Sequence, residues 1–145
     1  MSQPASQHTL RERLEGLACY LDVFLQPSFK NTYSWSVDNE ARKQVDAFCR
    51  KAYDLGWVTP GIDWPKWSKT AAGQALCKQP ELVATASVRD LECILTCYIR
   101  AERFGDGQLA EGFRNGVLIA MLQRMRELAE QESGGGSQQQ GSTRV

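Results

Sequence analysis

The chain has 145 residues, of which 42% are hydrophobic and 23% charged, and this composition suits one globular domain with one buried core. Basic and acidic residues both number 17, so the formal net charge is zero and no overall field attracts nucleic acid or an anionic membrane. Five cysteines lack zinc-ligand spacing and the one histidine is His8, so we predict no metal site and no cofactor.

The first predicted helix runs from about Thr9 to Leu25. Thr9 and Glu12 form a capping box that starts it, and Pro27 should end it. Residues 27–35 then read as a loop. The apolar stripe of this helix consists of Leu10, Leu14, Leu17, Leu21 and Phe24. Such a stripe suits either a core helix or a dimer seam.

Ser36 or Asp38 can cap a second helix, which Gly56 should stop. Its stripe has the same four-three spacing and consists of Ala41, Val45, Phe48, Ala52 and Leu55. The next segment, Trp57–Trp67, holds three tryptophans together with two prolines and a glycine, which forbid a continuous helix. We predict an ordered loop whose large indole area packs across the helices.

Asp63 should cap a shorter third helix through about Cys77, and Pro80 should open a helical turn. A strong helix then starts at a capping arrangement of Ser87 and Asp90 and ends at Gly105. Its apolar side chains are Val88, Leu91, Ile94, Leu95, Tyr98 and Ile99. Cys93 and Cys97 share a face of this helix, and we interpret them as small apolar packing residues.

Asp106 can cap another short helix, which Asn115 and Gly116 interrupt before a final helix rich in leucine and methionine. From Ser133 onward the glycine, glutamine and serine residues offer no apolar area to offset the entropy of ordering. The fold class that follows is all-α: a compact single-domain helical bundle of five to seven helices with an ordered tryptophan-rich loop. We expect a flexible leader at 1–8, the helical domain at 9–130 and a disordered tail at 131–145.

The densest cluster of charge and aromatic character lies where one helix must end and another begin, between Tyr98 and Gly107. Arg100 and Arg103 are neighbours on one helix surface, near the end where the helix dipole favours positive charge. Glu102, Asp106, Glu111 and Arg114 can reach the same corner, so each arginine can bind a carboxylate in bidentate fashion. Such a network predicts either a structural clamp or the rim of a binding surface.

Tryptophan and arginine are enriched among the residues that dominate the energy of protein interfaces. Core packing is the alternative role for the tryptophans. The candidate binding residues are Arg100, Glu102, Arg103, Phe104, Asp106, Trp64, Lys66 and Trp67. No catalytic set accompanies them, because the arginines would depress the pKa values of the carboxylates and the histidine lies in the leader.

Several separated motifs occur in a fixed order: Tyr53-Asp-Leu-Gly-Trp57, Ile62-Asp-Trp-Pro-Lys-Trp67, Thr96 to Leu109, and Asn115-Gly116 before the last helix. On these motifs the chain from about Lys30 to Ala129 resembles a family of small bacterial and phage proteins known only as a domain of unknown function. The family pattern Arg-x-x-Arg-Phe-x-x-Gly corresponds to Arg100, Arg103, Phe104 and Gly107, and Asp-Trp-x-x-Trp to Asp63, Trp64 and Trp67. The resemblance supports the fold and implies no activity or catalytic residue.

Our leading hypothesis is a non-catalytic protein-binding module from a phage or plasmid that acts on a host complex, for instance a counter-defence inhibitor such as an anti-CRISPR protein. An alternative is nucleic-acid binding through Lys30, Arg42, Lys43, Arg50, Lys51, Lys66 and Lys69, with affinity that falls steeply with salt. A third is an enzyme acting on a small anionic substrate at the arginine corner, which requires a concave pocket there. No apolar run approaches the roughly 20 residues of a membrane span, so we expect a cytoplasmic protein that does not enter a membrane.

Overall fold

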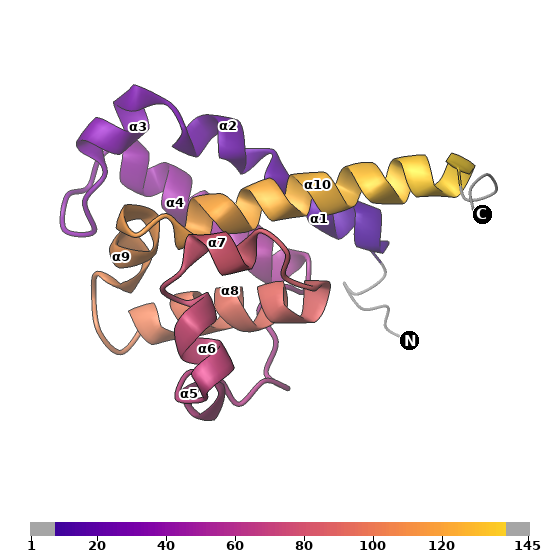
Figure 1. The fold of residues 1–145 in the computed structure, drawn as a ribbon. Coiled ribbons are helices and arrows are strands. Elements are labelled where there is room, and N and C mark those ends of the chain that lie inside the picture. The colour runs from indigo at the N-terminus through magenta and orange to yellow at the C-terminus, as the bar shows by residue number, and fades with distance from the viewer. Residues whose placement is uncertain (1–7, 139–145) are drawn as a thin grey trace, which may run out of the picture.

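The structure, a computed structural model, describes residues 8–138 and the side chains of residues 8–132, and all regular elements within them are helices. The ten helices of these residues (Figure 1) are α1 (Leu10–Ala18), α2 (Tyr20–Phe24), α3 (Pro27–Thr32), α4 (Glu40–Asp54), α5 (Trp64–Trp67), α6 (Ala71–Leu76), α7 (Pro80–Val83), α8 (Val88–Glu102), α9 (Gln108–Arg114) and α10 (Val117–Gln138). The all-α prediction is confirmed. The predicted number of five to seven is too low, because turns divide several predicted helices. The predicted leader, apart from His8, lies outside the described residues.

The first predicted helix is two helices, α1 and α2. The Thr9 hydroxyl accepts from the backbone N–H of Glu12 (3.1 Å) and the Glu12 carboxylate accepts from the N–H of Thr9 (3.0 Å), so the predicted capping box is confirmed. A turn at Cys19 separates the two helices while keeping right-handed helical backbone angles. Pro27 starts α3 where we predicted a loop, because proline's missing N–H costs nothing in the first turn of a helix.

The apolar stripe of α1 and α2 faces the protein's own core. Leu14, Leu17, Leu21 and Phe24 are at most 3% exposed, and α10 packs chiefly along α1, as Figure 1 shows. The surface considered as a dimer seam is therefore covered by α10. The oligomeric state itself stays a prediction.

The long helix α4 begins at a different cap from the two considered in the sequence. The Asn39 side chain accepts from the backbone N–H of the third helical residue (3.0 Å). Asn39 is therefore the capping residue, and the expected Ser36 and Asp38 are not. Asn39 has the extended backbone that a capping residue needs, and the next residue already begins the helix. The predicted end is confirmed: Gly56 has a φ of 78°, in the left-handed region that favours glycine.

The tryptophan-rich segment after α4 packs down onto α8 as predicted. Trp57 is fully buried (0% exposed) and Ile62 is buried too. The Thr96 hydroxyl of α8 donates to the Trp57 carbonyl oxygen (3.2 Å) and accepts from the Thr59 N–H (3.3 Å). One buried hydroxyl thus satisfies both backbone groups and fixes the loop, which places α5 beside α8.

The predicted helix over residues 63–77 is also divided. Asp63 caps α5 as expected, accepting from a backbone N–H of the first turn (3.2 Å). Thr70 caps a second helix, α6, accepting from the N–H of Gly73 (2.9 Å). A Cβ atom on Gly73 would lie 2.1 Å from the Trp67 carbonyl oxygen, so the two short helices fold back on each other only because this residue is glycine.

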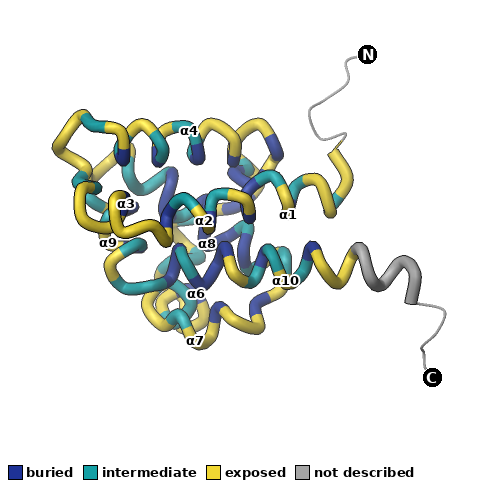
Figure 2. Tube along the Cα trace, turned by 90° about the horizontal axis from the view of Figure 1, so that it is seen from above, coloured by how far each residue is buried: buried dark blue, intermediate teal, exposed yellow. Residues whose placement is uncertain are grey.

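The core lies between α1, α4, α8 and α10, whose inward-facing positions are the buried ones in Figure 2. Leu91, Leu95 and Leu122 are each 0% exposed and belong to one buried cluster. α10 continues to Gln138, past the expected boundary of the tail at residue 131, and the rest of that predicted tail lies outside the described residues. Among the described residues, no helix combines the length and the apolar character that crossing a membrane requires.

Candidate protein-binding surface

The corner between α8 and α9 is held by Glu102, one of the predicted site residues. Its carboxylate accepts from the backbone N–H groups of Gly107 (3.1 Å) and Leu109 (2.8 Å), so it satisfies amides at the start of α9. Gly107 precedes that helix with a φ of 95°. Asp106, which we expected to cap α9, is exposed and accepts no such bond, so that prediction is wrong. Glu102 lies five residues before Gly107, and its side chain, which is longer than that of Asp106, binds these amides instead.

Of the arginine–carboxylate network expected at this corner, the described residues show the pair of Arg114 with Glu111 but not the pairs of Arg100 and Arg103. No ion pair within residues 8–132 joins Arg100 or Arg103 to a carboxylate. Arg103 is exposed, while Arg100 is half-buried with a buried Nε atom that lacks a hydrogen-bond partner. The Glu102 carboxylate is engaged by backbone amides, which leaves the guanidinium groups without the expected acceptor.

Aromatic side chains from α5 meet the corner. Phe104 is 80% exposed, and its ring centroid lies 6.1 Å from that of Trp64 with the two planes tilted by 30°. Trp67 is half-buried and packs against the core, whereas Lys66 is exposed between the two tryptophans. The packing of α5 against α8 therefore brings the two predicted motifs, at positions 63–67 and 100–107, onto one surface.

Two further aromatic residues lie at the same corner. Trp35 is 45% exposed, and its indole nitrogen lies 3.3 Å from where a Cβ atom on Gly107 would stand. Tyr53 is 43% exposed and lines an open groove of about 440 Å³ together with Glu102 and Arg103. Sequence reasoning missed Tyr53, although its position off the apolar stripe of α4 is the signal that marks it as an exposed aromatic.

We call this region the corner surface and define it by Trp35, Tyr53, Trp64, Lys66, Arg103 and Phe104. Cys49 also lines the groove of this surface. Burial, with smaller contributions from nearby carboxylates, raises the pKa of Cys49 to about 12, so the group is a protonated thiol and a poor nucleophile near neutral pH. The chemistry available at the corner surface is contact through aromatic faces and positive charge.

Trp57, in contrast, belongs to the core. Its indole N–H donates to the Arg13 carbonyl oxygen (2.9 Å), and the Arg13 guanidinium lies 4.5 Å from the centre of the indole rings. The same guanidinium donates to the carbonyl oxygen of Leu55 (2.9 Å) and to Glu92 (2.8 Å). This arginine joins α1, the end of α4 and α8. No local sequence pattern indicates these contacts, because the partners are 42 and 79 residues away.

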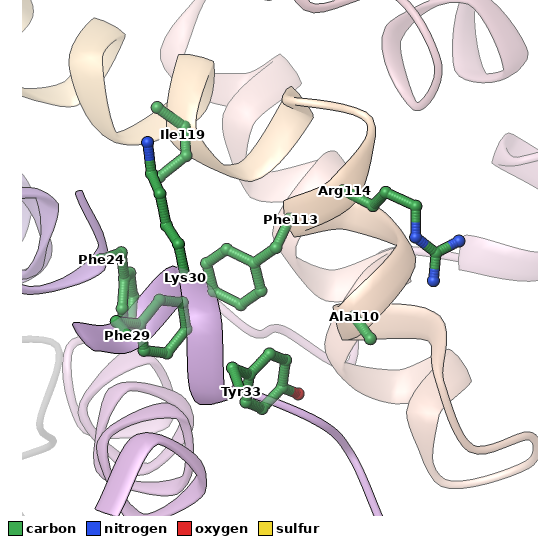
Figure 3. Close-up of a pocket in the computed structure, with 8 residues that line it drawn as sticks. All are labelled: Phe24, Phe29, Lys30, Tyr33, Ala110, Phe113, Arg114 and Ile119. Carbon is green, nitrogen blue, oxygen red and sulfur yellow. The ribbon is translucent and has the colours of Figure 1, made fainter. Parts of the chain in front are cut away.

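A second hollow lies between α3 and α9 (Figure 3). Its volume is about 350 Å³, and aromatic, aliphatic and two basic residues line it: Phe24, Phe29, Lys30, Tyr33, Ala110, Phe113, Arg114 and Ile119. Burial is the main cause that raises the pKa of Tyr33 to about 12, so its hydroxyl stays protonated. In Figure 3 the Arg114 guanidinium points away from the aromatic rings, and this arginine pairs with Glu111. The hollow is an apolar cleft at the edge of the core.

The basic residues considered for nucleic-acid binding do not follow one element. Most are on α4, Lys30 is on α3, and Lys66 and Lys69 lie on or just after α5. In Figures 1 and 2, α8 lies between α4 and α6, so the basic residues of α4 and those near α6 come from helices that are not adjacent to one another. Within the described residues, no group of three or more His, Cys, Asp and Glu side chains is arranged to hold a metal ion.

The sequence pattern of a family described as a family of unknown function, DUF6508, matches residues 9–131. The chain belongs to this family. The matched DUF6508 region contains all six residues of the corner surface, so the surface is part of the family's own domain. No curated protein and no solved structure matches the chain.

Proposed function

We propose that the protein is a non-catalytic protein-binding module and that the corner surface is where its partner docks. The observation that carries this proposal is Phe104, which is 80% exposed at the tip of the corner and lies beside the ring of Trp64. An exposed apolar side chain standing alone is ordinary, but here Trp35 and Tyr53 are exposed around the same corner. Exposed aromatic residues beside an arginine have the composition of an interface hot spot.

The charges of the surface favour a partner that presents acidic side chains around an apolar group. Lys66, Arg100 and Arg103 have no carboxylate within ion-pair distance among residues 8–132. The neighbouring carboxylates of Asp63 and Glu102 accept from backbone N–H groups of α5 and of the α9 start. Exposed carboxylates of Asp46 and Asp106 also lie near this corner, but the three positive charges outnumber these two. Complementary charge raises both specificity and association rate.

Site-specific photocrosslinking tests the proposal. A benzophenone amino acid replaces Phe104 in the full chain, which is expressed in cells of the organism that encodes it. Leu82, which is 42% exposed on α7, carries the same group as a matched control. We expect a discrete crosslinked protein from position 104 that is absent from position 82. Products shared equally by both positions, or none from position 104, would refute the corner surface as the docking site.

The captured protein then allows a quantitative test. Truncation of an interface anchor costs about 2 kcal/mol or more, which is a loss of roughly 30-fold in affinity. We expect Phe104→Ala to weaken binding by about that factor, Arg103→Glu to weaken it most at low salt, and Leu82→Ala to leave it unchanged. Isothermal titration calorimetry at two salt concentrations measures all three.

We also propose that the protein acts in the cytoplasm. The support is its cysteine usage: all five cysteines are free, although Cys77 and Cys97 lie next to each other. Proteins of oxidising compartments normally join such residues, whereas a reducing compartment keeps them as thiols. Compartment fractionation of tagged full-length protein tests this.

A further inference from the structure

Two cysteines far apart in the sequence share one cavity on the side of the molecule formed by α6 and α8. Cys77 follows the last residue of α6, and Cys97 lies on α8. Both thiols line an open cavity of about 420 Å³, and they are close enough for a side-chain hydrogen bond. This neighbourhood differs from the packing role expected for Cys97, because the residue is only half-buried and faces solvent-accessible space.

The backbone of Cys77 is held in place by polar groups. Its carbonyl oxygen accepts from the Tyr98 hydroxyl (2.7 Å) and from Nδ2 of Asn115 (3.3 Å). Asn115 also donates to the Tyr98 hydroxyl (3.3 Å), which closes a small network between α8 and the α9–α10 junction. The end of α6 is thereby anchored to Tyr98, the residue that follows Cys97 on α8, and both cysteines line the same cavity.

The two thiols are chemically unequal. The hydrogen bond from the Cys77 thiol to the Cys97 sulfur lowers the pKa of Cys97, although burial opposes it. The same bond raises the pKa of Cys77, and burial adds to that effect. A thiolate is the reactive form of cysteine, and a neighbouring thiol is what converts an oxidised cysteine into a disulfide.

We propose that Cys97 and Cys77 form an oxidation site that reacts with hydroperoxides and closes to an intramolecular disulfide. The Cys97 thiolate attacks one peroxide oxygen of H₂O₂, the O–O bond breaks, and the leaving hydroxide takes a proton to become water. The product is the sulfenic acid of Cys97. The Cys77 sulfur then attacks the Cys97 sulfur, the S–O bond breaks and a second water leaves. In total two thiols are oxidised by two electrons, one peroxide is reduced, and two waters form.

Peptide mass spectrometry of the full-length protein tests this proposal. Reduced protein is treated with a small excess of H₂O₂, quenched by alkylation and digested with trypsin without reduction. Trypsin cuts after Lys69 and Lys78 and after Arg89 and Arg100, so Cys77 is released in one peptide and Cys97 in another. We expect a new species in which these two peptides are joined, lighter than their sum by two hydrogens.

The controls separate this pair from the other cysteines. Cys93 shares the tryptic peptide of Cys97, so Cys93→Ser should preserve the crosslink and Cys97→Ser should abolish it. Cys19→Ser, at an exposed position between α1 and α2, should also preserve it. In Cys77→Ser the reaction should stop at the sulfenic acid, which dimedone labels on Cys97.

Three results would overturn the proposal: no crosslinked species from wild-type protein, a crosslink that survives Cys97→Ser, or dimedone labelling of Cys77→Ser that favours another cysteine. The wild-type experiment decides the question even if a serine variant fails to fold. It is independent of the proposed docking function, because it needs no partner.

Discussion

Replacing Glu102 and Asp106 in separate variants distinguishes the clamp found in the structure from the cap expected from the sequence. Both residues are acidic and lie close to the start of α9, so each is a candidate for holding that helix. In the structure only the Glu102 carboxylate accepts from the amides of Gly107 and Leu109, at 3.1 and 2.8 Å. Glu102→Ala should therefore destabilise the protein, and Asp106→Ala should not.

The magnitude follows from the bonds that are lost. Removing a capping side chain costs about 0.5 to 2 kcal/mol, and a hydrogen bond to a charged group contributes roughly 1.5 to 3 kcal/mol. Glu102 is partly exposed and α9 has 7 residues, so solvent and local fraying reduce the loss. We expect a decrease of about 2 kcal/mol in unfolding free energy for Glu102→Ala, and a change within about 0.5 kcal/mol for Asp106→Ala.

Urea unfolding followed by tryptophan fluorescence measures both values, because Trp57 is fully buried in the native state and reports loss of the core. A decrease of about 2 kcal/mol corresponds to a melting temperature lower by roughly 6 °C. Glu102→Gln should fall between the two alanine variants, since it keeps one acceptor oxygen but places an amide N–H₂ opposite a backbone N–H. Equal effects of Glu102→Ala and Asp106→Ala, or a larger effect at Asp106, would show that the clamp is misidentified.

Two further substitutions test the close packing described above. Gly73→Ala should lower the unfolding free energy by about 1 to 3 kcal/mol, because its Cβ would lie 2.1 Å from the Trp67 carbonyl oxygen. Gly61→Ala should be nearly neutral, since the atom nearest to its Cβ would be 3.5 Å away. Urea unfolding of the two variants compares these effects. Burial, the main cause, raises the pKa of Tyr98 from 10.0 to about 12, so the folded state holds this proton more tightly than the unfolded chain. The contribution of this proton to the unfolding free energy is complete below pH 10 and is lost as the pH rises towards 12. Tyr98→Phe should therefore be less stable than wild type at neutral pH and should lose less unfolding free energy between pH 10 and 12. Urea unfolding curves at each pH measure both differences.

The sequence predicted those parts of the fold that depend on local pattern. The stripes of α1, α4 and α8 and the capping boxes at Thr9 and Ser87 are set by residues three or four positions apart, and the structure confirms them. The division of the 63–77 segment was missed because it depends on how Gly73 meets a backbone carbonyl in three dimensions. Spacing alone carries no information about such an approach.

Contacts between distant residues were missed for the same reason. Arg13 binds the end of α4 and α8, and Cys77 meets Cys97, through separations that no local pattern spans. At the corner the sequence identified the right segment but assigned the wrong pairing. It treated the charges of Arg100 and Arg103 as partners for Glu102, whereas backbone amides at a helix start compete for the same carboxylate and here win it.

The contacts of Glu102 separate the two roles considered for the corner, the structural clamp and the binding surface. Glu102 stabilises the turn through the backbone, so Phe104, at 80% exposure, has little to contribute to folding. Phe104→Ala should then leave the unfolding free energy within about 0.5 kcal/mol of wild type while weakening the partner, and Glu102→Ala should lower stability first. If Phe104→Ala instead destabilised the fold as much as Glu102→Ala does, the aromatic tip would be a structural element and the docking proposal would lose its central support.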